Sequence, residues 1–225
     1  MFDLFFDLDG PILDVSEKYY RVYADLVKEY GSQPIPKEDY WDYKRRRIPD
    51  DTILGLSGIQ GWVEEYRQLR KSRIETLEYL ACDRIWPGVL LMLQELASHT
   101  SLILVTLRNS SETLKWELQN LGLLGVFSQV LSASGDNAGV ERAQVKVQLV
   151  QKAFGLKSFS GWFIGDTETD IHTGQLLGLQ TAAVTFGIRT KEQLASVQPN
   201  VVLESPECLI EWSKSLLNNL IKQPF

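Results

Sequence analysis

Four aspartates form two closely spaced pairs, and each pair follows a short apolar run. Asp7 and Asp9 come after FDLFF, Asp166 and Asp170 come after GWFIG, and Thr106 ends a third run, SLILVT. Carboxylates gathered in one crevice repel one another unless a cation lies among them, and donors that are all oxygen favour Mg²⁺ over Zn²⁺. Mg²⁺ commonly holds a phosphate, for which a threonine hydroxyl and loop amides are suitable donors. This set of residues therefore indicates phosphate chemistry.

These residues can meet only if the apolar runs are strands of one sheet. The runs are short, largely apolar on both faces and separated by helical patterns, which is typical of an α/β protein with a doubly wound, Rossmann-like parallel sheet. The predicted strands span 2–8, 101–106, 127–131, 161–165, 181–186 and, as a shorter sixth candidate, 201–204. Ligands of such sheets bind beyond the carboxyl ends of the strands, where Asp7, Thr106 and Asp166 are all expected.

The interval 15–86 differs from the rest because it contains no strand-like run. Apolar residues recur at helical spacing over 19–30, a second long helix is predicted over 61–81, and one or two shorter helices are predicted between them. We therefore predict an α/β core made of 1–14 and 87–225, with an all-helical cap inserted at 15–86. Because the insertion directly follows the loop with the first aspartate pair, it suggests a lid.

The motifs, taken in order, resemble those of the haloacid dehalogenase-like superfamily of phosphohydrolases. They are DLDGPILD at 7–14, the strand ending in Thr106, Lys146, and GDTETD at 165–170. The segment TFGIRTKEQL also looks like the loop after the fifth strand in phosphoglycolate-phosphatase-like members. The resemblance covers nearly the full chain, cap included. DxDG alone would be a weak signal, but the three strand-end motifs in this order are specific.

The resemblance implies a role for each aspartate. Asp7 would be the nucleophile that becomes an aspartyl phosphate, and Asp9 would protonate the leaving alcohol and then activate water. Mg²⁺ would be held by the Asp7 carboxylate, the Asp9 backbone carbonyl and Asp166, with Asp170 in support. The ion would let an anionic carboxylate approach an anionic phosphate.

The resemblance also implies a phosphate-binding set. Thr106 and the backbone amides of Leu107 and Arg108 would bind the phosphoryl oxygens. Lys146 would offset the charge of the nucleophile and bind the phosphate, although the proline that often follows this lysine in the family is missing. Lys152 is the alternative for that role.

Simpler explanations exist for several of these residues. Asp7 and Asp9 are also suited to capping a turn, and Asp166 and Asp170 to beginning a helix. The basic run 44–47 is either a solvated helix face or the source of an arginine that binds the anionic, non-reacting end of a substrate.

Composition limits the partners. The chain has 225 residues, 44% of them hydrophobic, and a net charge of −6, which argues against general nucleic-acid binding. No apolar window approaches the roughly 20 residues that span a bilayer, no signal-peptide pattern is seen, and two cysteines fit a reducing compartment. We expect a cytoplasmic protein with no membrane or nucleic-acid partner, either a monomer or a homodimer.

The leading prediction is a Mg²⁺-dependent phosphatase that acts on a small phosphorylated metabolite, a phosphoglycolate-like acid or a sugar phosphate. A capped site closes over small substrates and excludes water. The alternatives are a phosphomutase of the same fold and a catalytically silent binding module.

Overall fold

The computed structural model describes the chain except for residues 1, 134–138 and 223–225, so these parts of the predicted core lie outside the description. The chain divides into two compact units, one of Met1–Asp14 and Ile85–Phe225 and the other of Val15–Arg84. The second crossing between the units falls two residues before the boundary predicted from the sequence.

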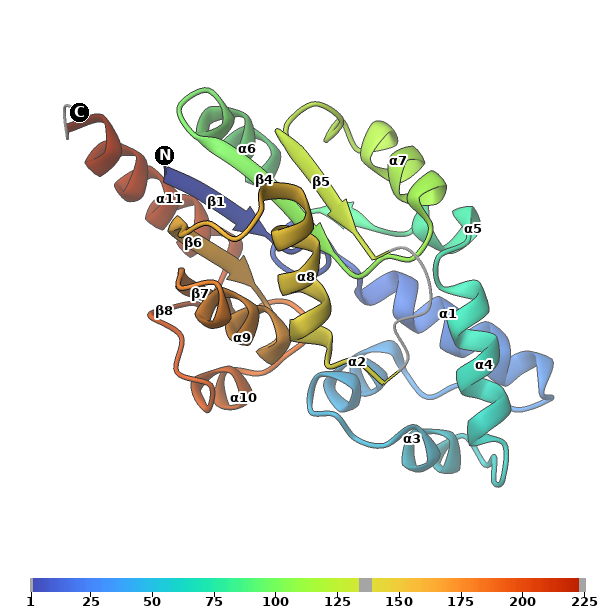
Figure 1. Ribbon diagram of the computed structural model, residues 1–225. Coiled ribbons are helices and arrows are strands. Elements are labelled where there is room, and N and C mark those ends of the chain that lie inside the picture. The colour runs from blue at the N-terminus through green and yellow to red at the C-terminus, as the bar shows by residue number, and fades with distance from the viewer. Residues whose placement is uncertain (1, 134–138, 223–225) are drawn as a thin grey trace. The chain divides into compact units, whose positions relative to one another are not determined.

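The first unit is built on a six-stranded parallel sheet in the order β5-β4-β1-β6-β7-β8 (Figure 1). The strands are β1 (Phe2–Phe6), β4 (Ser101–Thr106), β5 (Gln129–Ser132), β6 (Ser160–Gly165), β7 (Gln180–Val184) and β8 (Val201–Leu203). The prediction of a doubly wound parallel sheet is confirmed, and all six predicted strands are present. β1 ends two residues before its predicted end, because the chain leaves the sheet just after Asp7 and turns at Gly10.

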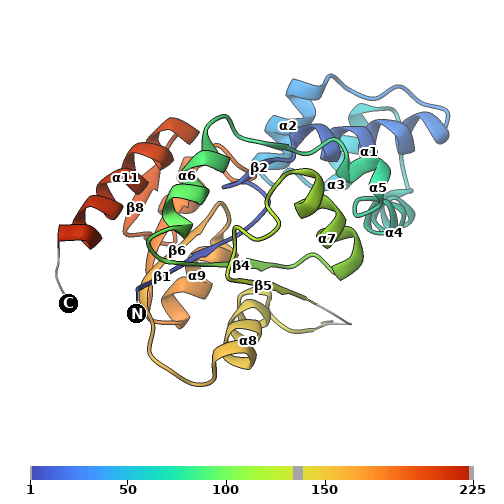
Figure 2. The same cartoon turned by 90° about the horizontal axis from the view of Figure 1, so that it is seen from above.

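Helices cover both faces of this sheet (Figure 2). One face carries α8 (Arg142–Phe154) and α9 (Glu168–Leu176), which contact each other, and the other carries α6 (Val89–Ala97) and α11 (Pro206–Lys222). The remaining helices of this unit are α7 (Ser111–Asn120) and α10 (Lys191–Ala195). The core beneath α8 is formed by apolar side chains of adjacent strands and of the helix itself: Phe5, Ile103, Val105, Val150 and Phe163.

β1 lies where the strand order reverses, with β4 on one side and β6 on the other. Phe6 is in register with Leu104 and with Ile164, and the Asp7 amide extends the ladder by donating to the Ile164 carbonyl at 2.9 Å. The three strands therefore end within two residues of one another in register. The residues that follow them emerge at one edge, at the kind of switch point where α/β sheets bind ligands.

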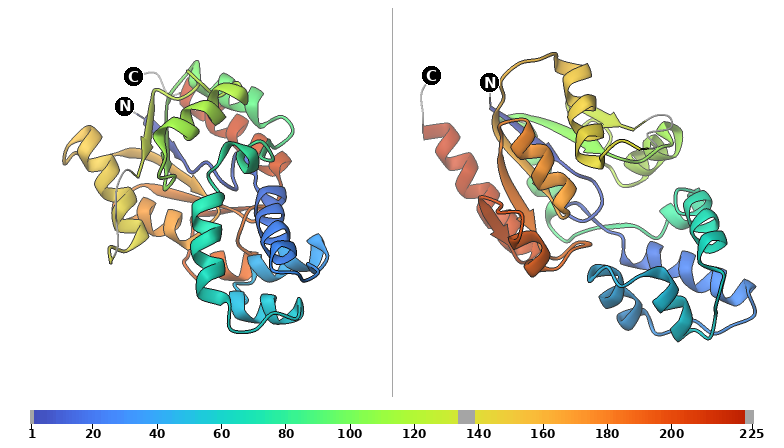
Figure 3. Two further views of the ribbon diagram at one scale, coloured as in Figure 1. Left: turned by 90° about the vertical axis from the view of Figure 1, so that its right-hand side faces the viewer. Right: turned by 60° about the horizontal axis from the view of Figure 1, so that its bottom comes forward.

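The second unit is all helical and has its own core (Figure 3). Its helices are α1 (Ser16–Glu29), α2 (Lys37–Arg45), α3 (Asp50–Leu56), α4 (Val63–Arg73) and α5 (Leu77–Leu80). The predicted apolar face of α1 is buried through Tyr23 and Leu26, among others. Tyr23 stacks on Tyr40 with ring centroids 4.4 Å apart, and the unit is therefore held together largely by aromatic packing.

Two details of this region differ from the sequence prediction. The single helix predicted over 61–81 is two helices, because the chain becomes extended at Thr76, with φ −78° and ψ 153°, before α5 begins. In addition, β3 (Arg84–Ile85) lies within 15–86, where no strand is predicted, and pairs with β2 (Leu13–Asp14) as a small two-stranded sheet.

A buried ion pair joins the two ends of the helical unit. Lys18 Nζ lies 2.5 Å from Asp83 Oδ2, and both side chains are almost completely shielded from solvent. Lys18 is in the first turn of α1 and Asp83 follows α5. By contrast, Arg46 of the basic run pairs with Asp42 at an exposed i, i+4 position, as expected for a solvated helix face.

None of the helices in the described part of the chain has the length and apolar character that a bilayer-spanning helix requires.

Candidate active site

Three aspartates converge at the end of the sheet. One carboxylate oxygen from each of Asp7, Asp166 and Asp170 lies within 4.8 Å of the other two, and all three residues are buried. Asp7 follows β1, Asp166 follows β6, and Asp170 lies in the first turn of α9. The expectation that separate strand ends bring these side chains together is met by the geometry of the sheet.

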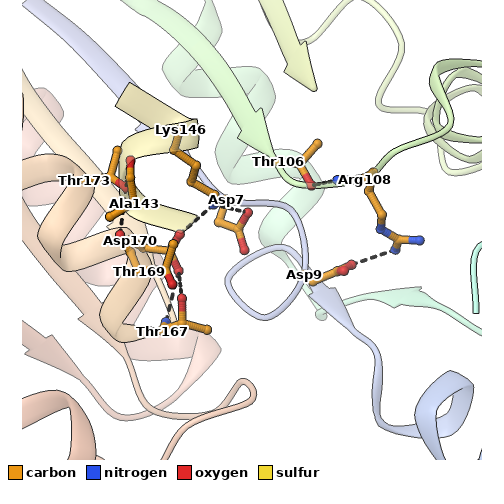
Figure 4. A network of polar contacts seen from close by, with 10 residues as sticks. All are labelled: Asp7, Asp9, Thr106, Arg108, Ala143, Lys146, Thr167, Thr169, Asp170 and Thr173. Atoms are coloured by element: carbon orange, nitrogen blue, oxygen red, sulfur yellow. Dashed lines mark hydrogen bonds and ion pairs between the residues drawn. The ribbon is translucent and has the colours of Figure 1, made fainter. Parts of the chain in front are cut away.

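Lys146 lies against this trio of aspartates. Its Nζ is 2.7 Å from Asp7 Oδ1 and 2.6 Å from Asp170 Oδ1, and the residue is only 2% exposed (Figure 4). The other oxygen of Asp170, Oδ2, accepts hydrogen bonds from the amide and the hydroxyl of Thr167, which caps α9. Asp170 thus stabilises the first turn of α9 and holds Lys146 at the same time. Lys152, the alternative in the sequence, is exposed on the same helix.

Asp166 is enclosed by backbone. A methyl group on Gly10, whose φ is +106°, would lie 2.1 Å from Asp166 Cγ, and one on Gly187 would lie 2.3 Å from Asp166 Oδ2. The Ile188 amide donates to Oδ2. Two loops therefore approach this carboxylate so closely that neither position admits a side chain.

The other oxygen, Asp166 Oδ1, is buried and has no hydrogen-bond partner among the residues that the structure describes. A buried carboxylate oxygen without a partner is costly unless a proton or a cation occupies it. A carboxylate oxygen of Asp166 also lies within 4.8 Å of one from Asp7 and one from Asp170, and three such oxygens are a donor set suited to a hard divalent cation. Three carboxylates and one ammonium carry a net charge of −2, which such an ion would cancel. The residues present therefore fit a metal ion.

Burial and mutual charge interactions shift the pKa values of Asp7, Asp166 and Lys146. Burial raises the pKa of Asp7 to about 7, the Asp170 and Asp9 carboxylates add to the rise, and Lys146 opposes it. Burial, together with the Asp170 and Asp7 carboxylates, also raises the pKa of Asp166 well above its ordinary value. Burial alone would lower the pKa of Lys146, but Asp170 and Asp7 raise it to about 12. The lysine is therefore charged at neutral pH and is the cation that the protein itself supplies.

The residues predicted to bind phosphate lie at the carboxyl end of β4. Thr106 ends the strand and is buried, and its hydroxyl accepts a hydrogen bond from the Arg108 amide at 3.3 Å. The structure thus places Thr106, Leu107 and Arg108 at the carboxyl end of the strand next to β1, as expected from the sequence.

Asp9 faces a different partner. Its Oδ1 accepts an ion-paired hydrogen bond from Arg108 Nη2 at 2.7 Å, and Figure 4 shows its side chain directed away from that of Asp7. The Asp9 carboxylate is not part of the trio, and its metal contact through the backbone carbonyl stays a prediction. The sequence motifs assign a role only to the amide of Arg108 and miss its side chain. The available signal was an arginine two residues after a buried strand end, facing the same edge as Asp9.

The chain is similar to known proteins over most of its length. A family model described as haloacid dehalogenase-like hydrolase matches residues 4–184. A phosphoglycolate phosphatase from Synechococcus elongatus is 25% identical over 214 residues, covering 95% of this chain and 98% of that protein. The pyrophosphatase PpaX of Bacillus cereus is 23% identical over 208 residues, covering 91% and 93% respectively.

Solved structures share the fold. A haloacid dehalogenase-like family hydrolase from Streptococcus pneumoniae superposes with a TM-score of 0.74 at 21% identity, covering 94% of this chain and 98% of that one. A structure described as a predicted phosphoglycolate phosphatase from Haemophilus somnus gives a TM-score of 0.71 at 18% identity, covering 93% and 96%. Because the family model spans most of the sequence, the chain belongs to the haloacid dehalogenase-like hydrolase family and is an enzyme of the phosphohydrolase type.

Proposed function

We propose that this enzyme is a Mg²⁺-dependent phosphatase that hydrolyses a small phosphomonoester through an aspartyl phosphate on Asp7. The observation that carries the proposal is the buried cluster in which Asp7 touches Lys146 and shares a possible cation site with Asp166. A carboxylate is a poor nucleophile toward an anionic phosphate unless positive charge lies beside it. This cluster supplies one such charge and has the donors for another.

In the proposed reaction, a carboxylate oxygen of Asp7 attacks phosphorus and the bond from phosphorus to the substrate alcohol breaks. Asp9 gives its proton to the departing alcohol oxygen. In the second step Asp9 takes a proton from water, the water oxygen attacks phosphorus, and the bond from Asp7 to phosphorus breaks to release inorganic phosphate. Asp9 acts as acid and then as base, so the cycle closes with both aspartates restored.

Other residues would hold the phosphoryl group during these steps. The Thr106 hydroxyl and the amides of Leu107 and Arg108 would donate to its oxygens, and Lys146 would bind it from the other side while screening Asp7. Mg²⁺ held by Asp7, Asp166 and the Asp9 carbonyl, with Asp170 in support, would neutralise the charge that otherwise keeps carboxylate and phosphate apart.

The substrate class proposed is a phosphoglycolate-like acid or a sugar phosphate. It is supported by the similarity to a phosphoglycolate phosphatase over nearly the whole chain and by the helical unit inserted a few residues after Asp9. Small substrates suit enzymes whose sites close during turnover. Similarity to a pyrophosphatase makes inorganic pyrophosphate a necessary member of any substrate panel.

The test is phosphate release from a panel of small esters, with Mg²⁺ and with a chelator. The expected result is Mg²⁺-dependent release from at least one small acid or sugar phosphate, lost in Asp7→Asn. Isomerisation of a sugar phosphate without net phosphate release would favour a mutase instead. No turnover of any ester, with Mg²⁺ bound, would favour a silent binding module.

A further inference from the structure

The Arg108 side chain is buried between two carboxylates. Its Nη2 lies 2.7 Å from Asp9 Oδ1 and 3.4 Å from Glu117 Oε2. Asp9 belongs to the loop after β1, Arg108 to the loop after β4, and Glu117 to α7. The three side chains thus link three separate segments of the chain.

This arrangement is not what stability alone would favour. Glu117 is only 1% exposed and Arg108 only 5% exposed, so two charged groups have been taken out of water. Burying an ion pair is often no better for stability than packing apolar side chains of similar volume in its place. Positions 108 and 117 are therefore places where charge has been kept at some energetic cost. Arg108 contacts the carboxylate of Asp9, and Glu117 contacts Arg108.

Arg108 is not directed at the trio of aspartates. Figure 4 shows its guanidinium extending from the end of β4 to Asp9, on the side opposite Lys146 and Asp170. A guanidinium that contacts one carboxylate oxygen limits the rotation of that carboxylate about its side-chain bonds. The contact at Oδ1 therefore limits the orientations that the Asp9 carboxylate can take.

We propose that Arg108 is a positioning residue for Asp9 and that Glu117 holds Arg108 in place. The inference rests on the proposed function, in which Asp9 gives a proton to the leaving alcohol. Arg108 and Glu117 take no part in bond making. They hold the Asp9 carboxyl where its proton can reach the departing oxygen. In an in-line displacement that oxygen lies across phosphorus from Asp7, which is why Asp9 is expected to point away from Asp7. The bond from phosphorus to this oxygen breaks as the bond from Asp7 to phosphorus forms.

A positioning role predicts an effect that depends on the leaving group. An alkyl phosphate must release a strongly basic alkoxide and needs the proton from Asp9, whereas 4-nitrophenyl phosphate releases a stable anion without it. The ratio kcat/KM reports steps up to phosphoryl transfer to Asp7 and excludes the later attack of water. Comparing kcat/KM for the two esters therefore isolates the proton donation.

The experiment measures both esters in the wild-type enzyme and in Arg108→Met, Arg108→Lys and Glu117→Gln. The control Lys191→Met also removes a cation that is paired with a glutamate, but that pair, with Glu204, is exposed on the surface of the same unit. For Arg108→Met we expect kcat/KM to fall about 100-fold with the alkyl ester and less than about 5-fold with the nitrophenyl ester. Arg108→Lys should recover part of the loss, and Lys191→Met should match wild type on both esters.

Glu117→Gln should also lower kcat/KM more for the alkyl ester than for the nitrophenyl ester, but by a smaller factor. It should lower kcat/KM little further in the Arg108→Met background, because Glu117 acts through Arg108. Thermal unfolding of every variant comes first. If Arg108→Met does not fold, Arg108→Lys and Glu117→Gln provide the test. Equal losses on both esters, or no loss, would overturn the inference while wild-type activity persists. An inactive wild type would instead overturn the proposed function.

Discussion

Lys146 shows how a charge can be kept inside a protein. Its ammonium group is removed from water but lies 2.7 Å from Asp7 and 2.6 Å from Asp170. A buried lysine without such partners tends to lose its proton, whereas two carboxylates keep it charged. Lys152, further along α8, is exposed and has no part in this arrangement. Lys146 therefore faces the buried aspartates, whereas Lys152 on the same helix faces solvent.

Replacing Lys146 with methionine is expected to abolish turnover and to destabilise the fold. The substitution leaves three buried carboxylates without their internal cation, and breaking a buried pair in this way commonly costs about 3–5 kcal/mol. Phosphate release and thermal unfolding measure the two effects. Lys152→Met on the same helix is the control and should leave both unchanged. A fully active Lys146→Met enzyme would contradict the proposed role.

The raised pKa of Asp7 makes stability depend on pH. The folded state holds this proton up to a pKa of about 7, whereas the ordinary value is 3.8, so the folded state binds more protons between these limits. The contribution of this group is therefore fully present below about pH 4 and is lost as the pH rises toward 7. Asp166, whose pKa is also raised, acts in the same direction.

A metal ion should reverse this trend, because it binds the ionised carboxylates and competes with protons. We expect Mg²⁺ to raise the melting temperature more at about pH 8 than at about pH 5. Thermal unfolding with Mg²⁺ and with a chelator at both pH values tests this without any assay of activity. In Asp7→Asn the difference should shrink. An equal or larger Mg²⁺ effect at the lower pH would be inconsistent with the acid cluster as the metal site.

At the scale of elements, the site depends on how closely loops can approach. The loops after β1 and after β7 both pass against Asp166, at Gly10 and at Gly187, with no room for a Cβ atom. Gly10 also needs a left-handed φ, whereas Gly187 is restricted only by space. A substitution at Gly187 therefore tests the close approach to Asp166 without also straining the backbone conformation.

Gly187→Ala is expected to displace the Asp166 carboxylate and so weaken Mg²⁺ binding and kcat/KM by about 10-fold or more, the range seen when supports of metal ligands are altered. Gly55→Ala in α3 is the matched control, since an added methyl group there would meet no atom within 4 Å and alanine favours a helix. It should leave Mg²⁺ binding unchanged. Mg²⁺ titration followed by thermal shift, together with kcat/KM, provides the comparison. Unaltered values in Gly187→Ala would show that the contact with Asp166 is not needed.

The ends of the strands could be predicted from the sequence, whereas the directions of some side chains and one helix end could not. Strands are marked by apolar runs, and parallel strands end at a common edge, so the residues after β1, β4 and β6 could be assigned to one site. Side-chain direction depends on packing that periodicity does not encode. The sequence pattern therefore groups Asp9 with the other acids, although its carboxylate faces Arg108. Similarly, apolar spacing continues past Thr76, but the backbone changes direction there and ends the predicted long helix.

At the scale of the whole molecule, each of the two units has its own hydrophobic core. The aromatic core of the helical unit involves residues between Tyr19 and Tyr79, whereas the core under α8 is drawn from strands and helices of the other unit. Within the helical unit, the Lys18–Asp83 pair joins the first turn of α1 to the segment after α5. A change at this pair should therefore affect one unit far more than the other.

Lys18→Met is expected to destabilise the helical unit by about 3 kcal/mol, since it leaves Asp83 buried without its cation. Hydrogen exchange should rise in α1 to α5 while β1, β4 and β6 keep their protection. Lys37→Met, which breaks the half-exposed pair with Glu17, is the control and should change much less. Pairing Lys18→Met with Asp83→Leu should restore protection. Exchange that rises equally throughout the sheet would argue against independent cores.

The small sheet formed by β2 and β3 has a consequence for exchanging the helical unit. The chain leaves the α/β unit along β2 and returns along β3, and the two run side by side. The segment between β2 and β3 therefore begins and ends at neighbouring strands. Replacing that segment with another of different length would therefore leave every connection of the parallel sheet intact.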